Sequence, residues 1–373
     1  TTLTQENFRV SEAEFAAAYE AVSPELLASL KKAIKNIYAY HSRAGRKDSV
    51  ETHDGRTTGY VVRPVSAAGI YAPGGTAPLS SSVLMGVLPA KAAGVERIVL
   101  ATPAKNGVVA PLTLVAAKEC GVSEVYKMGG AQAIAALAYG TQSVKKVDVI
   151  AGPGNIYVTL AKKEVYGEVG IDMLAGPSEI LIIADESANA RYVAADVLSQ
   201  AEHDVLARAI LVTPSRSLAE AVAKEVELQL ARLPRKEVVR KSIDTSGGIV
   251  VVDSLKEACA LANTVAPEHL EICTEHPEAL LPSITHAGAV FLGHYTPEPV
   301  GDYFAGPDHI LPTSGSAKFF QVLNEDTFTR KMSVISYTRE ALFADGEDIV
   351  RLARSEQLDA HANAVAIRLE EKI

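Results

Sequence analysis

Residues 59–103 read GYVVRPVSAAGIYAPGGTAPLSSSVLMGVLPAKAAGVERIVLATP, and this stretch decides the predicted fold. Short runs rich in Val, Ile and Ala, at 59–65, 67–73 and 96–103, are strand-like, and an Ala-rich apolar segment at 80–94 separates the second from the third. Strands that alternate with helices in this way are typical of a parallel sheet covered by helices on both faces.

The same alternation continues on both sides of that stretch. Strand-like and helical runs follow each other as far as KVDVIAGPG (146–154), and a second series begins with SEILIIAD (178–185). Two helices with candidate N-caps at Ser11 and Ser23 come first, and a helical tail begins near Arg339. The sequence therefore predicts an α/β protein with two tandem Rossmann-like units, each an incomplete doubly wound and mostly parallel sheet, followed by a helical C-terminal tail.

Composition narrows the class of partner and compartment. The 373 residues are 48% hydrophobic and carry a net charge of −9, which argues against a nucleic-acid partner because phosphate contacts need clustered Lys and Arg. Cys120, Cys259 and Cys273 are widely spaced in apolar surroundings, so free thiols in the reducing cytoplasm are expected. No run approaches the roughly 18 apolar residues of a membrane helix, and TTLTQENF lacks a signal-peptide pattern. No membrane association is expected.

Four Gly-containing loops border strand-like runs: YAPGGTAP (71–78), GGAQA (129–133), AGPGN (151–155) and AGPSE (175–179). Parallel sheets bind ligands at the carboxyl ends of their strands, where backbone N–H groups near a helix start can hold an anion. None of the loops matches the G-x-G-x-x-G dinucleotide motif, so each also has a simple interpretation as a turn.

The stretch DVLSQAEHD (196–204) is predicted as the middle of a helix, yet it carries Gln200, Glu202 and His203 among small apolar residues. Gln200 and His203 are three residues apart, so both side chains lie on one helix face and can reach a common point. An imidazole and an amide oxygen in that arrangement can bind a metal ion such as Zn²⁺. A solvent-facing pair is the alternative.

Three further polar groups are candidates for chemistry. Glu268 and His269 are adjacent, so on an extended segment they should point to opposite sides, and either can act as a general base. Asp302 and His309 lie in a segment too rich in Gly and Pro to be predicted as a helix. In the C-terminal tail, Glu356 and His361 are predicted to lie on a helix.

The run IDMLAGPSEILIIADESANARYVAADVLSQAEHD, followed by APEHLEI, GDYFAGPDHILPTSG and LDAHANA, closely resembles the histidinol dehydrogenase family. The resemblance extends from GYVVRPV to the C-terminus. It implies zinc ligands at Gln200, His203, Asp302 and His361, catalytic bases at Glu268 and His269, and NAD contacts at Tyr71, Gln132 and Asn155. The implied substrate contacts are Ser178, His309 and Glu356, together with the four zinc ligands and His269.

The resemblance also implies a reaction and an assembly. The family oxidises an amino alcohol through an aldehyde to an acid with two NAD molecules, ending histidine biosynthesis. His269 is then expected to accept the alcohol proton, and Glu268 to activate the water that hydrates the aldehyde. A homodimer is implied in which the tail completes the partner's site. The expected domains are residues 1–70 with 180–323, residues 71–179 with the NAD loops, and an exchanged tail at 324–373.

Three other functions are alternatives. The first is a zinc- and NAD-dependent dehydrogenase of the same fold that acts on another small polar alcohol. An anionic substrate would require Arg or Lys at the substrate positions, and Ser178, His309 and Glu356 stand there instead. A zinc hydrolase needs only three protein ligands and an open coordination position, and it leaves the Gly-containing loops unexplained. The third is a metal-binding protein without catalytic activity, in which Glu268 and His269 would have no role.

Overall fold

The structure is a computed structural model that describes residues 4, 7–44, 47–74 and 79–370. By contacts the chain divides into two compact units. The first unit comprises Thr1–Ala44 and Val65–Phe328, and the second comprises Gly45–Pro64 and Thr329–Ile373. Each unit is therefore built from segments that are distant in the sequence.

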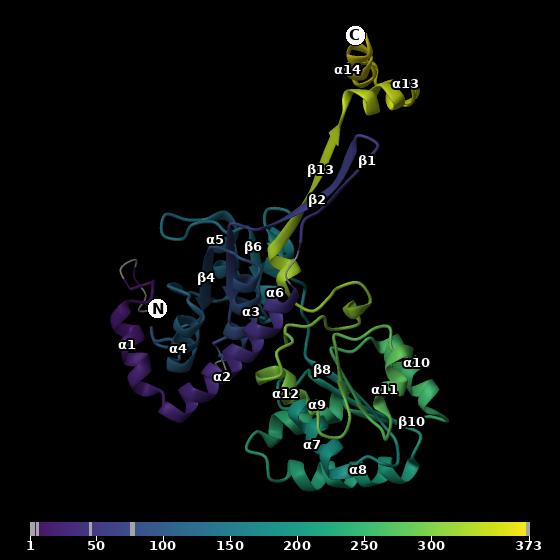
Figure 1. The fold of residues 1–373 in the computed structure, drawn as a ribbon. Coiled ribbons are helices and arrows are strands. Elements are labelled where there is room, and N and C mark those ends of the chain that lie inside the picture. The colour runs from purple at the N-terminus through teal and green to yellow at the C-terminus, as the bar shows by residue number, and fades with distance from the viewer. Residues whose placement is uncertain (1–3, 5–6, 45–46, 75–78, 371–373) are drawn as a thin grey trace. The chain divides into compact units, whose positions relative to one another are not determined.

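The first unit contains two parallel sheets (Figure 1). The first sheet has the order β5-β4-β3-β6-β7. Its strands are β3 (Ala67–Tyr71), β4 (Arg97–Thr102), β5 (Glu124–Lys127), β6 (Val149–Ala151) and β7 (Gly170–Ile171), joined by α3 (Ser81–Ala92), α4 (Pro111–Cys120), α5 (Gly130–Tyr139) and α6 (Ile156–Val165). Strand β3 is buried along its whole length, as expected for a central strand with helices on both faces.

The second sheet has the order β10-β9-β8-β11-β12, again all parallel. Its strands are β8 (Glu179–Ala184), β9 (Arg208–Thr213), β10 (Gly248–Val251), β11 (His269–Cys273) and β12 (Ala289–Leu292). The helices around it are α7 (Ala190–Ala201), α8 (Arg216–Leu230), α9 (Lys236–Ser246), α10 (Leu255–Val265), α11 (Pro277–Leu280) and α12 (Glu298–Tyr303), with short 3₁₀ turns η1 (Ser42–Ala44), η2 (Leu281–Ser283), η3 (Ser316–Lys318) and η4 (Glu325–Phe328) elsewhere in the unit.

The N-terminal helices are α1 (Glu12–Ala21) and α2 (Pro24–His41). Both predicted caps are confirmed, because the Ser11 and Ser23 hydroxyls accept hydrogen bonds from the backbone N–H groups of Glu14 and Leu26. Their buried residues, among them Phe15 and Ile37, belong to one hydrophobic core with α3, α4 and β3. The helices thus cover the first sheet. The predicted domain boundaries, 1–70 with 180–323, 71–179 and 324–373, stay a prediction.

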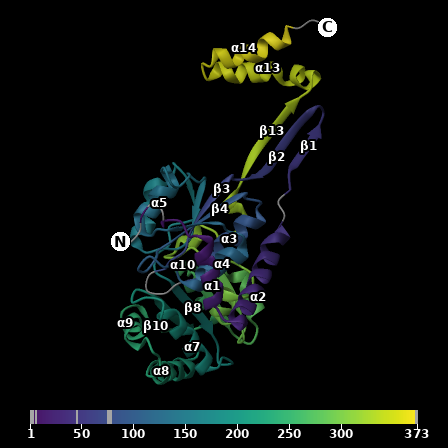
Figure 2. The same cartoon turned by 90° about the vertical axis from the view of Figure 1, so that its left-hand side faces the viewer.

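The second unit is an antiparallel ribbon with a helical hairpin. Strands β1 (Ser49–His53), β2 (Arg56–Pro64) and β13 (Thr329–Tyr337) pair in the order β1-β2-β13. Helices α13 (Arg339–Ser355) and α14 (Asp359–Leu369) follow β13 and contact each other (Figure 2). Arg56 on β2 donates two hydrogen bonds of 2.7 Å to Asp345 on α13, which fixes the hairpin to the ribbon.

The α/β class, the two parallel sheets and the helical C-terminal region are confirmed. Two details of the sequence prediction are wrong. GYVVRPV was placed in the parallel alternation, but residues 56–64 pair antiparallel with residues 329–337, so the tail contains a strand as well as helices. That pairing joins segments more than 260 residues apart, and a local pattern contains no information about such a partner. Within the described ranges, no helix is both long and apolar enough to cross a membrane.

Candidate active site

Helix α7 delivers the first two candidate ligands. Its N-cap is Asn189, and its last turn holds Gln200, whose side chain is fully buried although both amide atoms lack a hydrogen-bond partner among the described residues. The helix ends at Ala201, so the prediction that residues 196–204 form the middle of a helix is wrong: they contain its C-terminal end. His203 lies in the turn that follows, and its backbone N–H donates to the Gln200 carbonyl at 3.2 Å.

Helix α12 supplies the next group, and it corrects the prediction that Asp302 lies outside a helix. Pro299 is tolerated because it stands in the first turn, where a backbone N–H has no helical partner. The N–H of Glu298 donates to the Glu271 carboxylate at 2.8 Å, which caps the helix from strand β11. Glu298 and Asp302 are four residues apart and therefore share one face of α12.

Three side chains, from the turn after α7 and from α12, converge. His203, Glu298 and Asp302 each offer a donor atom, and these atoms all lie within 4.8 Å of one another. Oε1 of Glu298 and both amide atoms of Gln200 are buried and have no partner within the described residues. Buried polar atoms normally have partners, and imidazole, carboxylate and amide oxygen all bind Zn²⁺. The donor set therefore fits a divalent metal ion.

The two carboxyl groups of α12 differ in charge. Burial opposes ionisation of Asp302, but neighbouring His309, and then His269, hold its pKa down at about 2. Burial and the nearby charges of Asp302, Glu271 and Glu268 raise the pKa of Glu298 to about 10. In the absence of a cation, Asp302 is thus the charged member of the pair and Glu298 carries a proton.

Glu268 and His269 both bind the backbone of one residue, Glu179. Oε2 of Glu268 accepts a hydrogen bond of 2.9 Å from the backbone N–H of Glu179, and Nδ1 of His269 lies 3.1 Å from the Glu179 carbonyl. The two side chains are 3.7 Å apart, so the expectation that they point to opposite sides is wrong. Ala266, at φ +52°, reverses the chain after α10, and Glu268 precedes the first strand residue, so strand alternation does not apply to the pair.

The contacts of His269 define its protonation. A carbonyl can only accept, so Nδ1 carries the hydrogen and Nε2 carries the lone pair in the neutral ring. Nε2 is buried without a hydrogen-bond partner in the described ranges and lies 3.7 Å from Oε1 of Glu298. Burial lowers the pKa of His269 to about 4 despite opposing contributions from Asp302 and the Glu179 carbonyl. His269 is therefore a neutral base at pH 7.

Burial also raises the pKa of Glu268 well above its ordinary value, and the charges of Glu179 and Asp302 add to this effect. A carboxylate with a raised pKa binds a proton more strongly than an ordinary one once it is ionised. A divalent cation at the neighbouring donor cluster would oppose the elevation, because its positive charge favours the ionised form.

The predicted substrate residues fall into both units. His309 lies in the loop after α12, with Nδ1 3.1 Å from the Asp302 carbonyl. Ser178 precedes β8, and its carbonyl accepts from the N–H of Arg208. Glu356 and His361 are exposed residues of the second unit, at the C-cap of α13 and in the first turn of α14. The convergent cluster described above is made of first-unit residues.

The predicted cofactor residues stand at the carboxyl ends of the first sheet. Tyr71 ends β3, Gln132 is exposed in the first turn of α5 after β5, and Asn155 caps α6 after β6. Residues 75–78 of the first loop lie outside the described residues. The fourth loop, 175–179, instead precedes β8, so it borders the amino end of a strand in the second sheet.

A cavity of about 560 Å³ in the first unit is lined by residues of the loops after β3 and β6 and by His203 of the donor cluster. Its lining combines Tyr71 and Asn155 of the first sheet's loops with His203 and with Arg235 and Tyr303 near the helices of the second sheet. The full lining is Tyr71, Pro73, Gly74, Leu79, Pro103, Gly154, Asn155, Glu202, His203, Arg235 and Tyr303. The volume is in the range of small-molecule sites. A ligand here would touch the cofactor loops at one end and the candidate metal ligand at the other.

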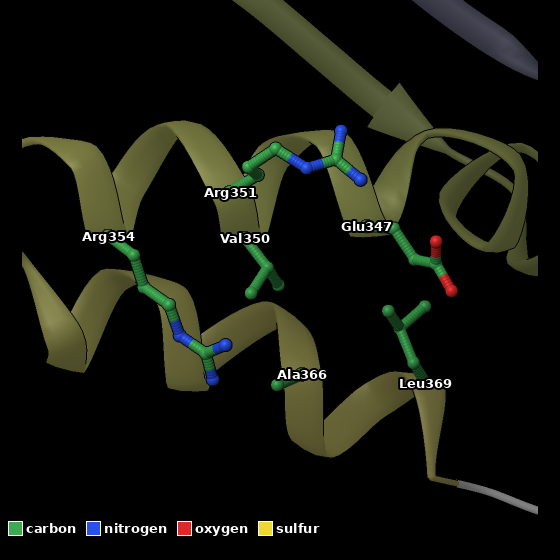
Figure 3. Close-up of a pocket in the computed structure, with 6 residues that line it drawn as sticks. All are labelled: Glu347, Val350, Arg351, Arg354, Ala366 and Leu369. Carbon is green, nitrogen blue, oxygen red and sulfur yellow. The ribbon is translucent and has the colours of Figure 1, made fainter.

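A second hollow, of about 440 Å³, lies between α13 and α14 (Figure 3). It is lined by Glu347, Val350, Arg351, Arg354, Ala366 and Leu369. No predicted site residue lines it, and we assign it no role in the chemistry.

Sequence reasoning missed two residues. Glu298 stands four residues before Asp302 in PEPVGDYF, and that helical spacing of two carboxylates was a usable signal. Glu179 opens the apolar run EILIIA, where a carboxylate buried at the start of a central strand is unusual. Its backbone N–H binds Glu268 and its carbonyl binds His269, and its carboxylate accepts a 2.7 Å hydrogen bond from the N–H of Ser314.

Comparisons with known proteins agree on one family. The family model described as histidinol dehydrogenase matches residues 1–369. The chain is 56% identical to the histidinol dehydrogenase of Heliobacterium mobile, covering 99% of this chain and 87% of that protein. It is 54% identical to the enzyme of Bacillus cereus, covering 98% and 86%.

Solved structures give the same result. The crystal structure of histidinol dehydrogenase from Elizabethkingia anophelis matches with a TM-score of 0.94 at 42% identity, covering 97% of this chain and 84% of that one. An NAD-dependent aldehyde dehydrogenase from Sinorhizobium meliloti matches with a TM-score of 0.55 at 15% identity, covering 89% and 82%, which is a likeness of fold alone.

Proposed function

Because this chain belongs to the histidinol dehydrogenase family, we propose that it oxidises L-histidinol through L-histidinaldehyde to L-histidine, the last steps of histidine biosynthesis. The proposed cofactors are NAD and one zinc ion per subunit. The observation that carries the proposal is the placement of two buried bases, Glu268 and His269, beside a cluster of metal-ligand side chains.

The proposed zinc ligands are Gln200, His203 and Asp302 with His361 of the tail. The unpartnered amide of Gln200 and the mutual proximity of His203 and Asp302 support this set. When bound, zinc would hold the imidazole and amino nitrogens of histidinol and so orient it. Glu298 shares the cluster, and the positive charge of a bound zinc ion would favour its ionised form, as it would for Glu268.

NAD would accept a hydride in each of the two oxidations. Tyr71, Gln132 and Asn155 are the proposed contacts. Support comes from their position at the carboxyl ends of parallel strands and from the cavity that two of them share with His203.

His269 acts first in the proposed sequence. Its Nε2 lone pair accepts the hydroxyl proton of histidinol as the hydride leaves the carbon, and the Glu179 carbonyl stabilises the resulting imidazolium through Nδ1–H. Glu268 acts in the second oxidation: its carboxylate removes a proton from the water that adds to the aldehyde. The hydrate then has a C–H bond from which a second hydride can leave.

Ser178, His309 and Glu356 are proposed to bind the substrate. The Nδ1 of His309 faces the Asp302 carbonyl, which leaves its Nε2 for the substrate. Glu356 offers a carboxylate to a cationic amine, and no basic residue stands at these three positions. An amino alcohol with an imidazole suits this set better than an anionic substrate does.

A homodimer with a shared site is also proposed, in which Glu356 and His361 serve the partner's site. The second unit supports it because it lacks a core: of its described residues only Ala341, Gly346 and Ala362 are buried. Large apolar side chains such as Ile335 and Leu352 remain 73% and 68% exposed, and an exposed apolar surface of this kind indicates a protein interface. The three buried, unbridged cysteines support the proposal that the enzyme works in the reducing cytoplasm.

The test is a stoichiometric assay with limiting histidinol and excess NAD. Two molecules of NADH per histidinol are expected, and a zinc chelator should abolish the reaction until zinc is restored. Absence of turnover with histidinol, alongside NADH formation from another small amino alcohol, would replace the substrate. Hydrolysis of an ester without NADH formation would point instead to a zinc hydrolase.

A further inference from the structure

The loop between β6 and α6, residues 152–155, is held from behind by a buried ion pair. Lys162 on α6 and Asp172 after β7 form an ion pair whose side chains are 3% and 1% exposed. Both also bind the same residue. The Lys162 Nζ donates to the Gly152 carbonyl at 3.0 Å, and the Gly152 N–H donates to Oδ2 of Asp172 at 2.8 Å.

Gly152 packs closely against the backbone of Tyr71 at the end of β3. Gly152 has φ +120°, and a Cβ placed on it would lie 2.1 Å from the carbonyl oxygen of Tyr71. Only glycine permits this close approach. Tyr71 in turn accepts a hydrogen bond of 3.1 Å at its hydroxyl from the N–H of Gly130. The contacts thus link three loops at the carboxyl edge of the first sheet.

A buried ion pair contributes little net stability to a fold. Removing two charges from water cancels much of their attraction, and well-packed apolar residues are often as good or better. This pair, however, has a directional use, because it supplies one donor and one acceptor to the two sides of one residue. An apolar pair cannot fix a backbone in that way. The loop so fixed contributes Gly154 and Asn155 to the cavity lining.

We propose that Lys162 and Asp172 are positioning residues for the dinucleotide, because they clamp Gly152 and thereby place Gly154 and Asn155 at the cavity that would receive the cofactor. Neither side chain is expected to touch the cofactor, since both are covered. The proposal rests on the proposed function in one respect, namely that the cavity between Tyr71, Asn155 and His203 receives NAD.

The experiment measures NADH binding directly, by the increase in NADH fluorescence on titration with the full-length protein; the chain has no tryptophan to interfere. The variant is Lys162→Met, which keeps the length of the side chain but removes the donor. The matched control is Lys146→Met, because Lys146 pairs with Glu168 at 2.5 Å beside the same sheet but is 45% exposed and holds no loop.

Lys162→Met should weaken NADH binding about 10-fold or more, the effect of moving a positioning loop by roughly an ångström. Lys146→Met should stay within about twofold, as for a surface ion pair. The KM for histidinol should also change by less than about twofold in both variants, because the clamp acts at the cofactor end. Wild-type NADH affinity in Lys162→Met, or an equal loss in the control, would overturn the proposal.

Lys162→Met leaves a buried carboxylate unpaired and can fail to fold. The double variant Lys162→Met/Asp172→Asn has no unpaired charge, and its amide oxygen can keep one of the two backbone N–H bonds, from Gly152 or from Met173, that the Asp172 carboxylate accepts. It should fold and still bind NADH more weakly than wild type, since the Gly152 carbonyl has lost its donor. Normal binding by this folded double variant would refute the clamp.

Amide hydrogen exchange separates this proposal from the proposed function. Peptides that cover residues 152–155 should exchange faster in Lys162→Met or the double variant than in Lys146→Met, with or without NADH. If wild type binds no NADH, the cofactor assignment fails and the exchange result still decides whether the clamp exists. Unchanged exchange in these peptides contradicts the clamp even if the enzyme is fully active.

Discussion

Replacing Glu268 by Gln separates the two proposed oxidations. The Glu268 carboxylate accepts the N–H of Glu179 at 2.9 Å, and a glutamine amide has the same shape and can accept the same hydrogen bond through its oxygen. The fold and the position of His269 should therefore persist. What disappears is the capacity to take a proton from water.

The magnitude follows from the role of a general base. Such a group contributes roughly 10²- to 10⁴-fold to a proton-transfer step, which corresponds to about 2.7–5.5 kcal/mol of activation free energy. Glu268→Gln should lower the rate of aldehyde oxidation by that factor. Alcohol oxidation should fall less than about 10-fold, because the Nε2 lone pair of His269 and its hydrogen bond to the Glu179 carbonyl remain.

The assay uses limiting histidinol with an aldehyde trap, and separately histidinaldehyde as substrate. Wild type should form two NADH per histidinol without the trap, and Glu268→Gln should form one, with the aldehyde captured. His269→Gln is the matched control and should lose mainly the first step. Equal losses in both steps, in a Glu268→Gln protein with wild-type melting temperature, would refute the division of roles.

Four further results are expected. His203→Ala should lose bound zinc, measured by metal analysis, and at least about 100-fold of its activity in the NADH assay. Its melting temperature should change little, since the large hydrophobic core does not depend on this site for its stability. Stoichiometric zinc in this variant would remove His203 from the ligand set. Mixing inactive His203→Ala and His361→Ala chains should restore up to about a quarter of wild-type activity per site, because a mixed dimer has one site with both changes and one with neither. If the subunits are shown to exchange and no activity returns, the site is not shared. Burial raises the pKa of Asp308 well above its ordinary value, so the folded state keeps a proton that the unfolded chain releases above about pH 4, and the free energy of unfolding falls as the pH rises through that window. In urea unfolding, Asp308→Asn should therefore become progressively more stable than wild type from about pH 4 to 7. A stability difference that does not change with pH would contradict this. Burial raises the pKa of the Cys120 thiol to about 12, so in the folded protein at pH 8 it should react with a thiol reagent at least about 10³-fold more slowly than free cysteine, as mass spectrometry of labelled peptides can check.

Local patterns were enough for most of the fold. The period of apolar residues and the Ser caps at Ser11 and Ser23 predicted helices and strands that the structure contains, and the βαβ rhythm predicted two parallel sheets. These features depend on neighbours within a few residues, and the sequence shows those neighbours directly. The family resemblance supplied the candidate residues by position, which no spacing rule could have assembled.

The arrangement of the site depended on contacts between distant segments. Glu298 joined the donor cluster because Glu271, on a strand, caps the short helix α12 that sequence reasoning had read as a loop. Glu268 and His269 turn toward each other because the backbone N–H and carbonyl of Glu179, some 90 residues away, bind one side chain each. A local pattern cannot reveal a partner at that separation.

The sequence by itself determined which segments become helices and strands, because propensity, capping and apolar periodicity act between residues that are close along the chain. It also provided the chemical groups of the site. Only the tertiary structure decided their state: burial makes His269 a neutral base and keeps a proton on Glu298, and the pairing of β2 with β13 joins the two ends of the second unit. Desolvation and long-range pairing depend on which atoms surround a group in space, and chain order alone does not specify those atoms.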